Sequence, residues 1–163
     1  MFQLVPTADM DKCGQLVALP MKDGFAVTAY TTAARAKGYP VILIPGYTAG
    51  QELVATIASS GVNAIPCLVG IAVDNVAATS IGLWQITGRA EALVYDTSTL
   101  AAGAMLELLT ATSVAGLTTA ASTSLADHTA AVLVDAVTAA ENSGSPVLKT
   151  VILNPVPHNC ESS

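Results

Sequence analysis

Apolar residues alternate with polar or small residues in several short stretches, which turn-forming residues separate. Residues 25–32 (FAVTAYTT) and 39–47 (YPVILIPGY) are rich in β-branched and aromatic side chains. Residues 81–86 (IGLWQI) and 147–153 (VLKTVIL) place apolar side chains on both faces. Period-two patterns are typical of strands, and apolar residues on both faces indicate strands covered on both sides. The pattern therefore predicts an all-β protein.

A second regularity is an internal repeat that begins after residue 48. Residues 49–53 (AGQEL) and 73–78 (VDNVAA) precede one strand-like stretch, and residues 102–106 (AGAML) and 134–140 (VDAVTAA) precede another. Such a repeat indicates that one structural unit occurs twice. We interpret each copy as a strand opened by glycine, a connection and a hairpin. The expected fold is a small β-barrel or sandwich built from two related hairpin units.

One stretch, residues 125–141, supports a helix as well as a strand. Ser124 and Asp127 resemble a capping box, and Gly144 follows the end, as at many helices. The match to the first copy favours a strand. So do three β-branched residues in this stretch, which are Val132, Val134 and Val137.

The ends of the chain differ in character from its centre. Residues 1–23 mix prolines, charged residues and short apolar pieces, which predicts an N-terminal arm or edge ribbon. Residues 24–153 form the predicted β domain. Pro155 and Pro157 indicate that residues 154–163 form an extended tail, because proline restricts its own backbone and that of the residue before it.

The composition is apolar without being typical of a membrane protein. Hydrophobic residues make up 52% of the 163 residues and charged residues only 11%. The longest uninterrupted apolar run, residues 64–73, is shorter than the roughly 18 residues needed to cross a bilayer. The first 14 residues have no basic region ahead of a long apolar segment, unlike a secretory signal. We expect no membrane partner and synthesis in the cytoplasm.

The charge distribution argues against nucleic acid as a partner. The formal net charge is −6, and binding to a phosphate backbone requires clustered cations. A chain with few charges and many small side chains suits a surface that other protein covers, so we expect a subunit of an assembly. The cations are scattered along the chain as Lys12, Lys22, Arg35, Lys37, Arg89 and Lys149.

No sequence motif of a nucleotide-binding loop, metalloprotease or serine hydrolase occurs. The three cysteines, Cys13, Cys67 and Cys160, are an odd number without a C-x-x-C pair, which argues against a zinc site or a disulfide framework. Cys67 lies in the longest apolar run, and we expect it to be a small buried hydrophobic residue.

Two histidines are candidate functional residues. His128 follows Asp127, and an acid can orient a catalytic imidazole, but adjacent residues on a strand point to opposite faces. A solvated or interface histidine is the favoured interpretation. His158 and Cys160 could bind a metal as a pair, although two ligands are too few for a closed site.

Carboxylates offer two further candidates. Asp9, Asp11 and Asp23 carry oxygen ligands of the kind a hard cation takes, but an exposed acidic arm is the favoured interpretation. Glu91 and Glu107 could form a pair for acid–base chemistry, but nothing in their spacing brings them together. We expect them to face solvent, or Glu91 to pair with Arg89 on the same strand face.

Trp84 is the only tryptophan of the chain and lies within a strand-like stretch. A ligand platform would need aromatic companions, and the other aromatic residues do not cluster around it in the sequence. Trp84 is therefore expected to anchor a core or an interface. The sequence predicts no catalytic, cofactor-binding or metal site.

The repeated pattern resembles the small capsid decoration (cement) proteins of tailed bacteriophages. The resemblance covers about residues 48–153. The matching segments are 49–53 (AGQEL), 69–78 (VGIAVDNVAA), 81–94 (IGLWQITGRAEALV), 101–108 (AAGAMLEL), 130–140 (AAVLVDAVTAA) and 147–153 (VLKTVIL).

The resemblance implies a β-rich protein without enzymatic activity or cofactor. Such proteins are often homotrimers that sit on the outside of the virion and lock neighbouring major capsid proteins together, and an N-terminal arm often mediates attachment. Synthesis would take place in the cytoplasm of the bacterial host. The alternatives are another virion subunit, such as a head-fibre base or tail tube, and a β-barrel that binds a small molecule.

Overall fold

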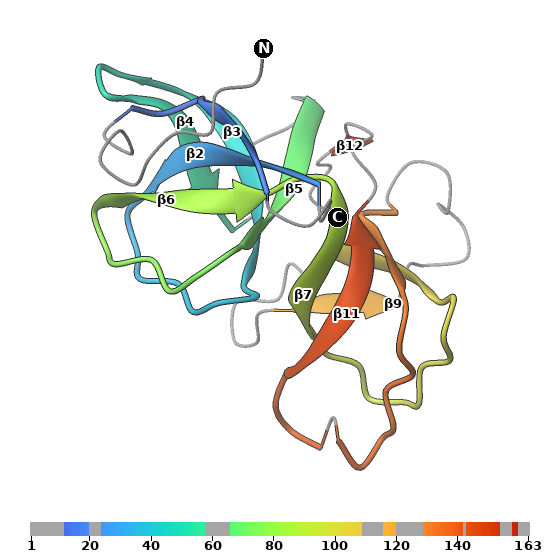
Figure 1. The fold of residues 1–163 in the computed structure, drawn as a ribbon. Coiled ribbons are helices and arrows are strands. Elements are labelled where there is room, and N and C mark those ends of the chain that lie inside the picture. Colours follow the sequence, from blue (N-terminus) through green and yellow to red (C-terminus); the bar gives the residue numbers. More distant parts are fainter. Residues whose placement is uncertain are drawn as a thin grey trace.

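The computed structural model shows two β-barrels that lie side by side (Figure 1). All regular secondary structure in the described part of the chain is β-strand, which confirms the all-β fold class. The first barrel is drawn in blue to light green and the second in olive to red. The structure describes residues 12–19, 24–57, 66–108, 116–119, 129–141, 143–153 and 158–159.

The first barrel is a ring of five strands: β2 (Phe25–Thr31), β3 (Pro40–Thr48), β4 (Gln51–Thr56), β5 (Pro66–Ala72) and β6 (Ser80–Gln85). Strand β2 pairs in parallel with β4 and antiparallel with β6. Strand β3 pairs with β4 and β5, and β5 pairs with β6, which closes the ring. Two short strands extend this sheet, β1 (Leu16–Ala18) beside β2 and β12 (His158–Asn159) beside β5.

The second barrel is a closed ring in the order β10-β11-β7-β9-β8. Its longest pairing joins β7 and β11 over seven residues. Strand β7 also pairs in parallel with β9, and β8 pairs with β9 and β10. The strands are β7 (Gly88–Val94), β8 (Met105–Leu108), β9 (Leu117–Thr119), β10 (Ala131–Leu133) and β11 (Val147–Leu153).

The two barrels share one topology. In each, the first strand lies between the third, which runs parallel to it, and the fifth, while the second and fourth strands complete the ring. Isolated bridges repeat too, because Arg35 pairs with Val76 in the first barrel as Leu100 pairs with Val137 in the second. The prediction of two related units is confirmed, and each unit is a complete five-stranded barrel.

The alignment of the two copies by their A-G-x-x-L segments was wrong. Gly103 donates its N–H to the carbonyl of Leu133, and the residue that does the same in the first barrel is Gly38, which donates to Ala72. Gly50, the glycine matched in the sequence, lies in the turn between β3 and β4. Both Gly38 and Gly50 have positive φ, so the glycine signal alone could not distinguish them.

The stretch that supported either a helix or a strand contains a strand. Ala131–Leu133 forms β10, and residues 134–141 form turns and the bridge at Val137, with no helix in the described residues 129–141. The backbone of β10 pairs with β8 on one side and with β11 on the other, which places this strand in the ring. Within the described segments, no helix is long and apolar enough to cross a membrane.

Each barrel has its own buried core. In the first barrel the core surrounds Trp84, whose side chain is 0% exposed, and includes Val27, Ala29, Val41 and Leu43. Trp84 pairs with Val27 across β2 and β6, and Val151 pairs with Ala90 across β7 and β11. Val151 is therefore the counterpart of Trp84 in the second barrel.

The barrels are joined by buried side chains and by hydrogen bonds. Val69 and Ile71 of β5 belong to the same buried cluster as the core of the second barrel. Leu93 donates its N–H to the carbonyl of Gly38, at 2.8 Å. A Cβ atom at Gly38 would lie 2.3 Å from Cδ1 of Leu148, so any other residue at this position would have to displace the Leu148 side chain and adopt a positive φ.

Candidate functional site

Most of the sequence-predicted ligand candidates lie outside the described residues. His158 lies in β12, where its backbone pairs with that of Cys67 in β5. The structure describes the backbone of these two residues but not their side chains. Among the described residues, no group of three histidine, cysteine, aspartate or glutamate side chains could hold a metal ion. The candidates outside the description are Asp9, Asp11, Asp23, Asp127, His128 and Cys160.

The structure does not form the carboxylate pair considered from the sequence. Glu91 lies on β7 and Glu107 on β8, and β9 separates these strands in the ring. Glu91 is exposed, as the first of the two alternatives expected. Its partner is Lys37, with its Nζ 2.5 Å from a carboxylate oxygen, so the alternative pairing with Arg89 was wrong. Strand spacing placed Arg89 and Glu91 on one face, but Lys37 comes from the other barrel and was not visible in the sequence.

Trp84 is a core residue, as one of the two sequence-based interpretations expected. Its side chain is fully buried, and its Nε1 donates a hydrogen bond to the carbonyl of Ala29 at 3.0 Å. A buried indole that has satisfied its only polar group has no free edge for a ligand. Trp84 therefore holds the first barrel together.

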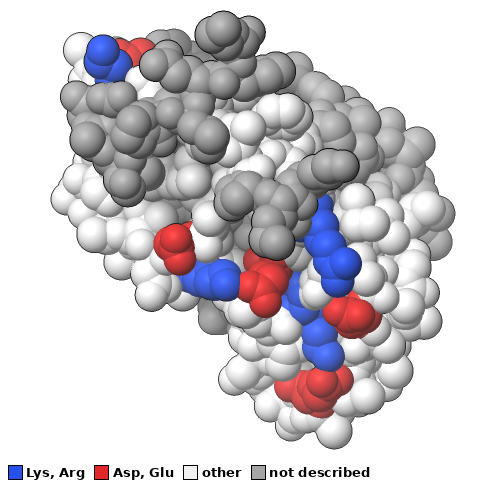
Figure 2. All heavy atoms as spheres, viewed as in Figure 1, with Lys and Arg blue, Asp and Glu red and all other residues white. Residues whose placement is uncertain are grey.

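A polar cleft of about 430 Å³ lies between the barrels. Its walls include the Lys37–Glu91 ion pair, Arg89, Gln85 and the apolar Ile71. Charged side chains form a band across the middle and lower part of the face shown in Figure 2, and residues around this band are mostly uncharged. Three charged residues, Lys37, Arg89 and Glu91, line the cleft.

The polar groups in the cleft bond to one another and to the backbone. Gln85 donates from Nε2 to the carbonyls of Thr87 and Arg89, at 3.0 and 2.8 Å, which ties the end of β6 to the start of β7. Hydrogen bonding and charge attraction from Glu91 raise the pKa of Lys37, so the lysine stays charged and is not activated as a base. The cleft therefore contains an ion pair and amide contacts that position the two barrels.

A second polar cluster surrounds Asp96, just after β7. Its carboxylate accepts hydrogen bonds from the backbone and hydroxyl of Ser98 and from the backbone and hydroxyl of Thr119, and one from the Thr118 hydroxyl. Partial burial raises the pKa of Asp96, but the hydrogen bonds from Thr119 and Ser98 outweigh it and lower the pKa to about 2. Asp96 thus stays ionised and fastens β9 to the end of β7.

A third cluster closes the connection between β10 and β11. Lys149 donates from Nζ to a Glu141 carboxylate oxygen at 2.8 Å and to the carbonyl of Ala136 at 3.1 Å. Glu141 also accepts from the backbone and hydroxyl of Thr138. The hydrogen bond from Lys149, with those from Thr138, lowers the pKa of Glu141 to about 2. These contacts attach the connection between β10 and β11 to Lys149 of β11.

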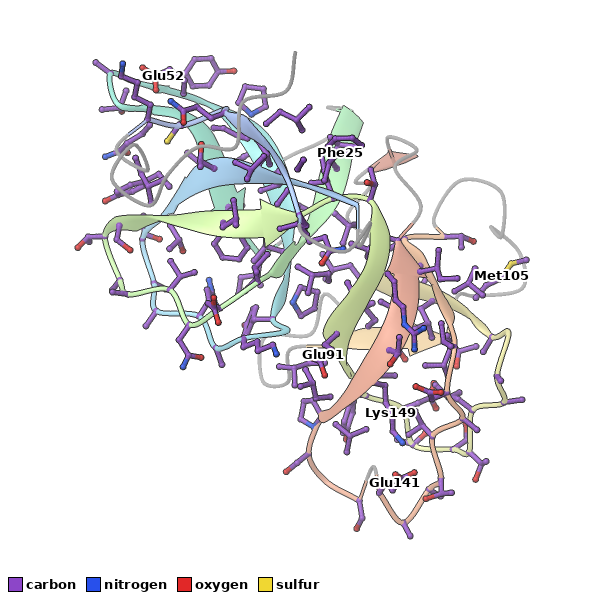
Figure 3. All side chains as sticks on the ribbon, viewed as in Figure 1. Phe25, Glu52, Glu91, Met105, Glu141 and Lys149 are labelled. Atoms are coloured by element: carbon purple, nitrogen blue, oxygen red, sulfur yellow. The ribbon has the colours of Figure 1, made fainter. Side chains whose placement is uncertain are left out.

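Among the described residues, Tyr47 is the most exposed large apolar side chain, at 95%. It lies near the end of β3, in the tip of the β3–β4 hairpin, which we call the hairpin tip and define as residues 45–50. Figure 3 shows this hairpin, labelled at Glu52, at the far end of the first barrel from Glu91. The sequence marked these residues only as a strand end and the start of the repeat, because exposure at a turn depends on how far it projects.

Contacts from β4 and from the segment around Cys13 hold the hairpin tip. Glu52 accepts a hydrogen bond from the N–H of Gly50 at 2.9 Å, which lowers the pKa of Glu52. Cys13 donates from Sγ to the Gly50 carbonyl at 3.3 Å. A Cβ atom at Gly46 would lie 1.8 Å from the carbonyl oxygen of Gln51. The pairing shifts register between Pro45 and Thr48, so the tip is a bulged turn that presents a tyrosine.

Fold and geometry together define an all-β protein of two five-stranded barrels with a projecting hairpin tip. No protein-family model, curated protein or solved structure matches the chain.

Proposed function

We propose that the protein is a structural virion protein that binds the outer surface of a phage capsid and stabilises contacts between major capsid subunits. The observation that carries the proposal is the hairpin tip, where a held turn presents Tyr47 to a partner. Tyrosine is enriched among the residues that dominate protein–protein binding, because it offers a large rigid surface with one polar group. A turn that is already ordered loses little conformational entropy on docking.

The sequence resemblance to capsid decoration proteins supports the same proposal. The segments that carry it include strands and turns of both barrels, among them β6, β8 and β11. A shell offers many identical sites, so a protein that bridges neighbouring subunits gains total affinity from several modest contacts. A surface with few charges suits such contacts because burial of unpaired charge is costly.

Two alternatives receive less support. Another virion subunit, such as a head-fibre base or tail tube, would use the same surface properties, but the resemblance points to decoration proteins. A barrel that binds a small molecule would need an open interior. The interiors of both barrels are occupied by buried side chains such as Trp84 and Val151, and the open cleft lies outside them.

The proposal is tested by mixing the full-length protein with empty expanded capsids of the phage that encodes it, followed by electron microscopy. We expect added density at repeated positions on the outer shell. Tyr47→Ala should weaken binding by at least about tenfold, the effect of truncating a dominant interface residue. Leu16→Ala is the matched control, since Leu16 is also exposed and apolar and lies in the same sheet.

Shells without added density would refute the proposal. Density that persists unchanged with Tyr47→Ala would refute the role of the hairpin tip while leaving capsid binding in place. Both variants concern exposed side chains, and circular dichroism verifies that each keeps the wild-type fold.

A further inference from the structure

The shared topology allows each outward-facing residue of one barrel to be compared with its counterpart in the other. In the first barrel, Ile71 pairs with Pro40 on one side and Gln85 on the other. In the second barrel, Val132 pairs with Met105 and Ile152 in the same way. We call Pro40, Ile71 and Gln85 the first row, and Met105, Val132 and Ile152 the second row. Each row comes from the second, fourth and fifth strands of its barrel.

The two rows differ sharply in exposure. In the first row Pro40 is buried, Ile71 is 1% exposed and Gln85 is 6% exposed. In the second row Met105 is 45% exposed and Ile152 is 52% exposed, with Val132 half-buried between them. Equivalent positions of one fold are therefore covered in one barrel and open in the other.

The other barrel packs against two members of the first row, Ile71 and Gln85. Ile71 lies in the buried cluster of the second barrel's core, and Gln85 donates hydrogen bonds to the backbone of Thr87 and Arg89 at the start of β7. The first row is thus an established barrel-to-barrel interface within the chain. The second row, which is more apolar than the first, has the same position on its own barrel and remains open.

We propose that the second row is a self-association surface, on which the second row of another copy of this chain docks. The interface within the chain shows that this face of the fold receives a barrel of the same kind. In the first barrel, the counterpart of β7 is β2, but residues 12–19 cover its outer face: Thr28 is fully buried and donates from its hydroxyl to the carbonyl of Lys12 at 2.6 Å. The open surface that another copy offers is therefore its own second row.

The apolar chemistry of the second row fits this occupant. Two of the five exposed large hydrophobic side chains in the described part of the chain, Met105 and Ile152, belong to it. Rows that meet around a symmetry axis bring identical apolar side chains together, and closed symmetric assemblies are the usual form of soluble oligomers. Met105 adapts its shape to a neighbour more readily than a branched side chain does.

Sedimentation velocity of the full-length protein over a range of concentrations tests the proposal. The wild type should form an oligomer that dissociates on dilution. Ile152→Asp should weaken association by at least about tenfold, because it replaces buried apolar area with an unpaired charge. Leu16→Asp, at an exposed apolar residue of the first barrel, should leave association unchanged.

A positional readout accompanies the variants. A photo-crosslinking amino acid placed at Ile152 should join two copies, and mass spectrometry should locate the crosslink on the second row of the partner copy. The same amino acid at Leu16 should give no such product. Circular dichroism verifies that Ile152→Asp remains folded, so loss of association is separated from loss of structure.

A wild-type protein that stays monomeric at every concentration would overturn the inference. So would an Ile152→Asp variant that associates like the wild type, or crosslinks that map to the first barrel. Capsid binding plays no part in these measurements, and Tyr47→Ala should keep self-association. Failure of the self-association surface and failure of the proposed capsid function are therefore distinguishable.

Discussion

The Asp96 cluster gives a quantitative test of how the second barrel is held together. Replacing Asp96 by asparagine keeps the size of the side chain but turns one acceptor oxygen into an NH₂ donor. Four of the five hydrogen bonds to Asp96 come from Ser98 and Thr119. An amide keeps only one acceptor oxygen, so either the N–H of Ser98, after β7, or the N–H of Thr119, on β9, loses its partner.

The size of the effect follows from the pKa. A change of one unit corresponds to about 1.4 kcal/mol, so a fall from 3.8 to about 2 in Asp96 represents roughly 2 kcal/mol at full strength. Solvent around this partly exposed carboxylate reduces the contribution to about 1 kcal/mol. We expect Asp96→Asn to lower the free energy of unfolding at neutral pH by about that amount.

The lowered pKa also predicts how the stabilisation by Asp96 changes with pH. Because the folded state lowers the pKa of Asp96, the stabilisation is present above the unfolded-state pKa of 3.8 and disappears as the pH falls through about 2. The difference in unfolding free energy between wild type and Asp96→Asn should therefore be constant above about pH 5 and shrink toward pH 2. Urea denaturation followed by circular dichroism at several pH values measures it.

Asp135→Asn serves as the control, because Asp135 is an exposed carboxylate in a turn of the same barrel. Its substitution should change stability little at any pH. Equal unfolding free energies for wild type and Asp96→Asn at pH 7 would refute the reasoning. A difference that persists undiminished at pH 2 would show that the loss comes from packing rather than from charge.

Three further substitutions test the packing. Ile71→Ala should lower the free energy of unfolding by about 2–5 kcal/mol. Because Ile71 joins the two barrels, the unfolding midpoints measured by Trp84 fluorescence and by circular dichroism should fall together. Two separate transitions would contradict this expectation. Trp84→Phe should cost about 1–3 kcal/mol in thermal denaturation, since the Ala29 carbonyl loses a buried donor, and an unchanged midpoint would show that this bond contributes nothing. Gly38→Ala should destabilise the protein more than Gly103→Ala, because both glycines have positive φ but only Gly38 contacts the other barrel. Equal losses of stability would show that the contact with the other barrel adds nothing to the strain of the positive φ.

The strands were predictable from the sequence because their information is local. Alternation and β-branched residues marked Phe25–Thr31 and Val147–Leu153, and the repeated V-D-x-V segment marked equivalent turns after β5 and β10. The prediction that Trp84 anchors a core or an interface followed from its position in a strand without aromatic neighbours in the sequence, and the structure places it in a core. These conclusions depend on residues close together in the chain.

The candidate site was less predictable because its parts come from distant segments. Lys37 pairs with Glu91 across the junction of the barrels, and Cys13 reaches Gly50 in the hairpin tip. Neither pair has a spacing that marks it in the sequence. The incorrect match of Gly50 with Gly103 has the same cause, because it too depends on contacts between distant segments. Gly38 and Gly50 both have positive φ, and only the hydrogen bond from Gly38 to Ala72 shows that Gly38 is the counterpart of Gly103.

By itself, the sequence determined that this protein is built of strands, that a unit occurs twice, and which side chains alternate between faces. Only the tertiary structure decided which outward faces are covered. Gln85 is polar and buried, whereas its counterpart Ile152 is apolar and half exposed. Hydropathy predicts the reverse order, because it describes a side chain and not its neighbours. The packing of one barrel on the other covers Gln85, and that contact exists only after both rings have closed.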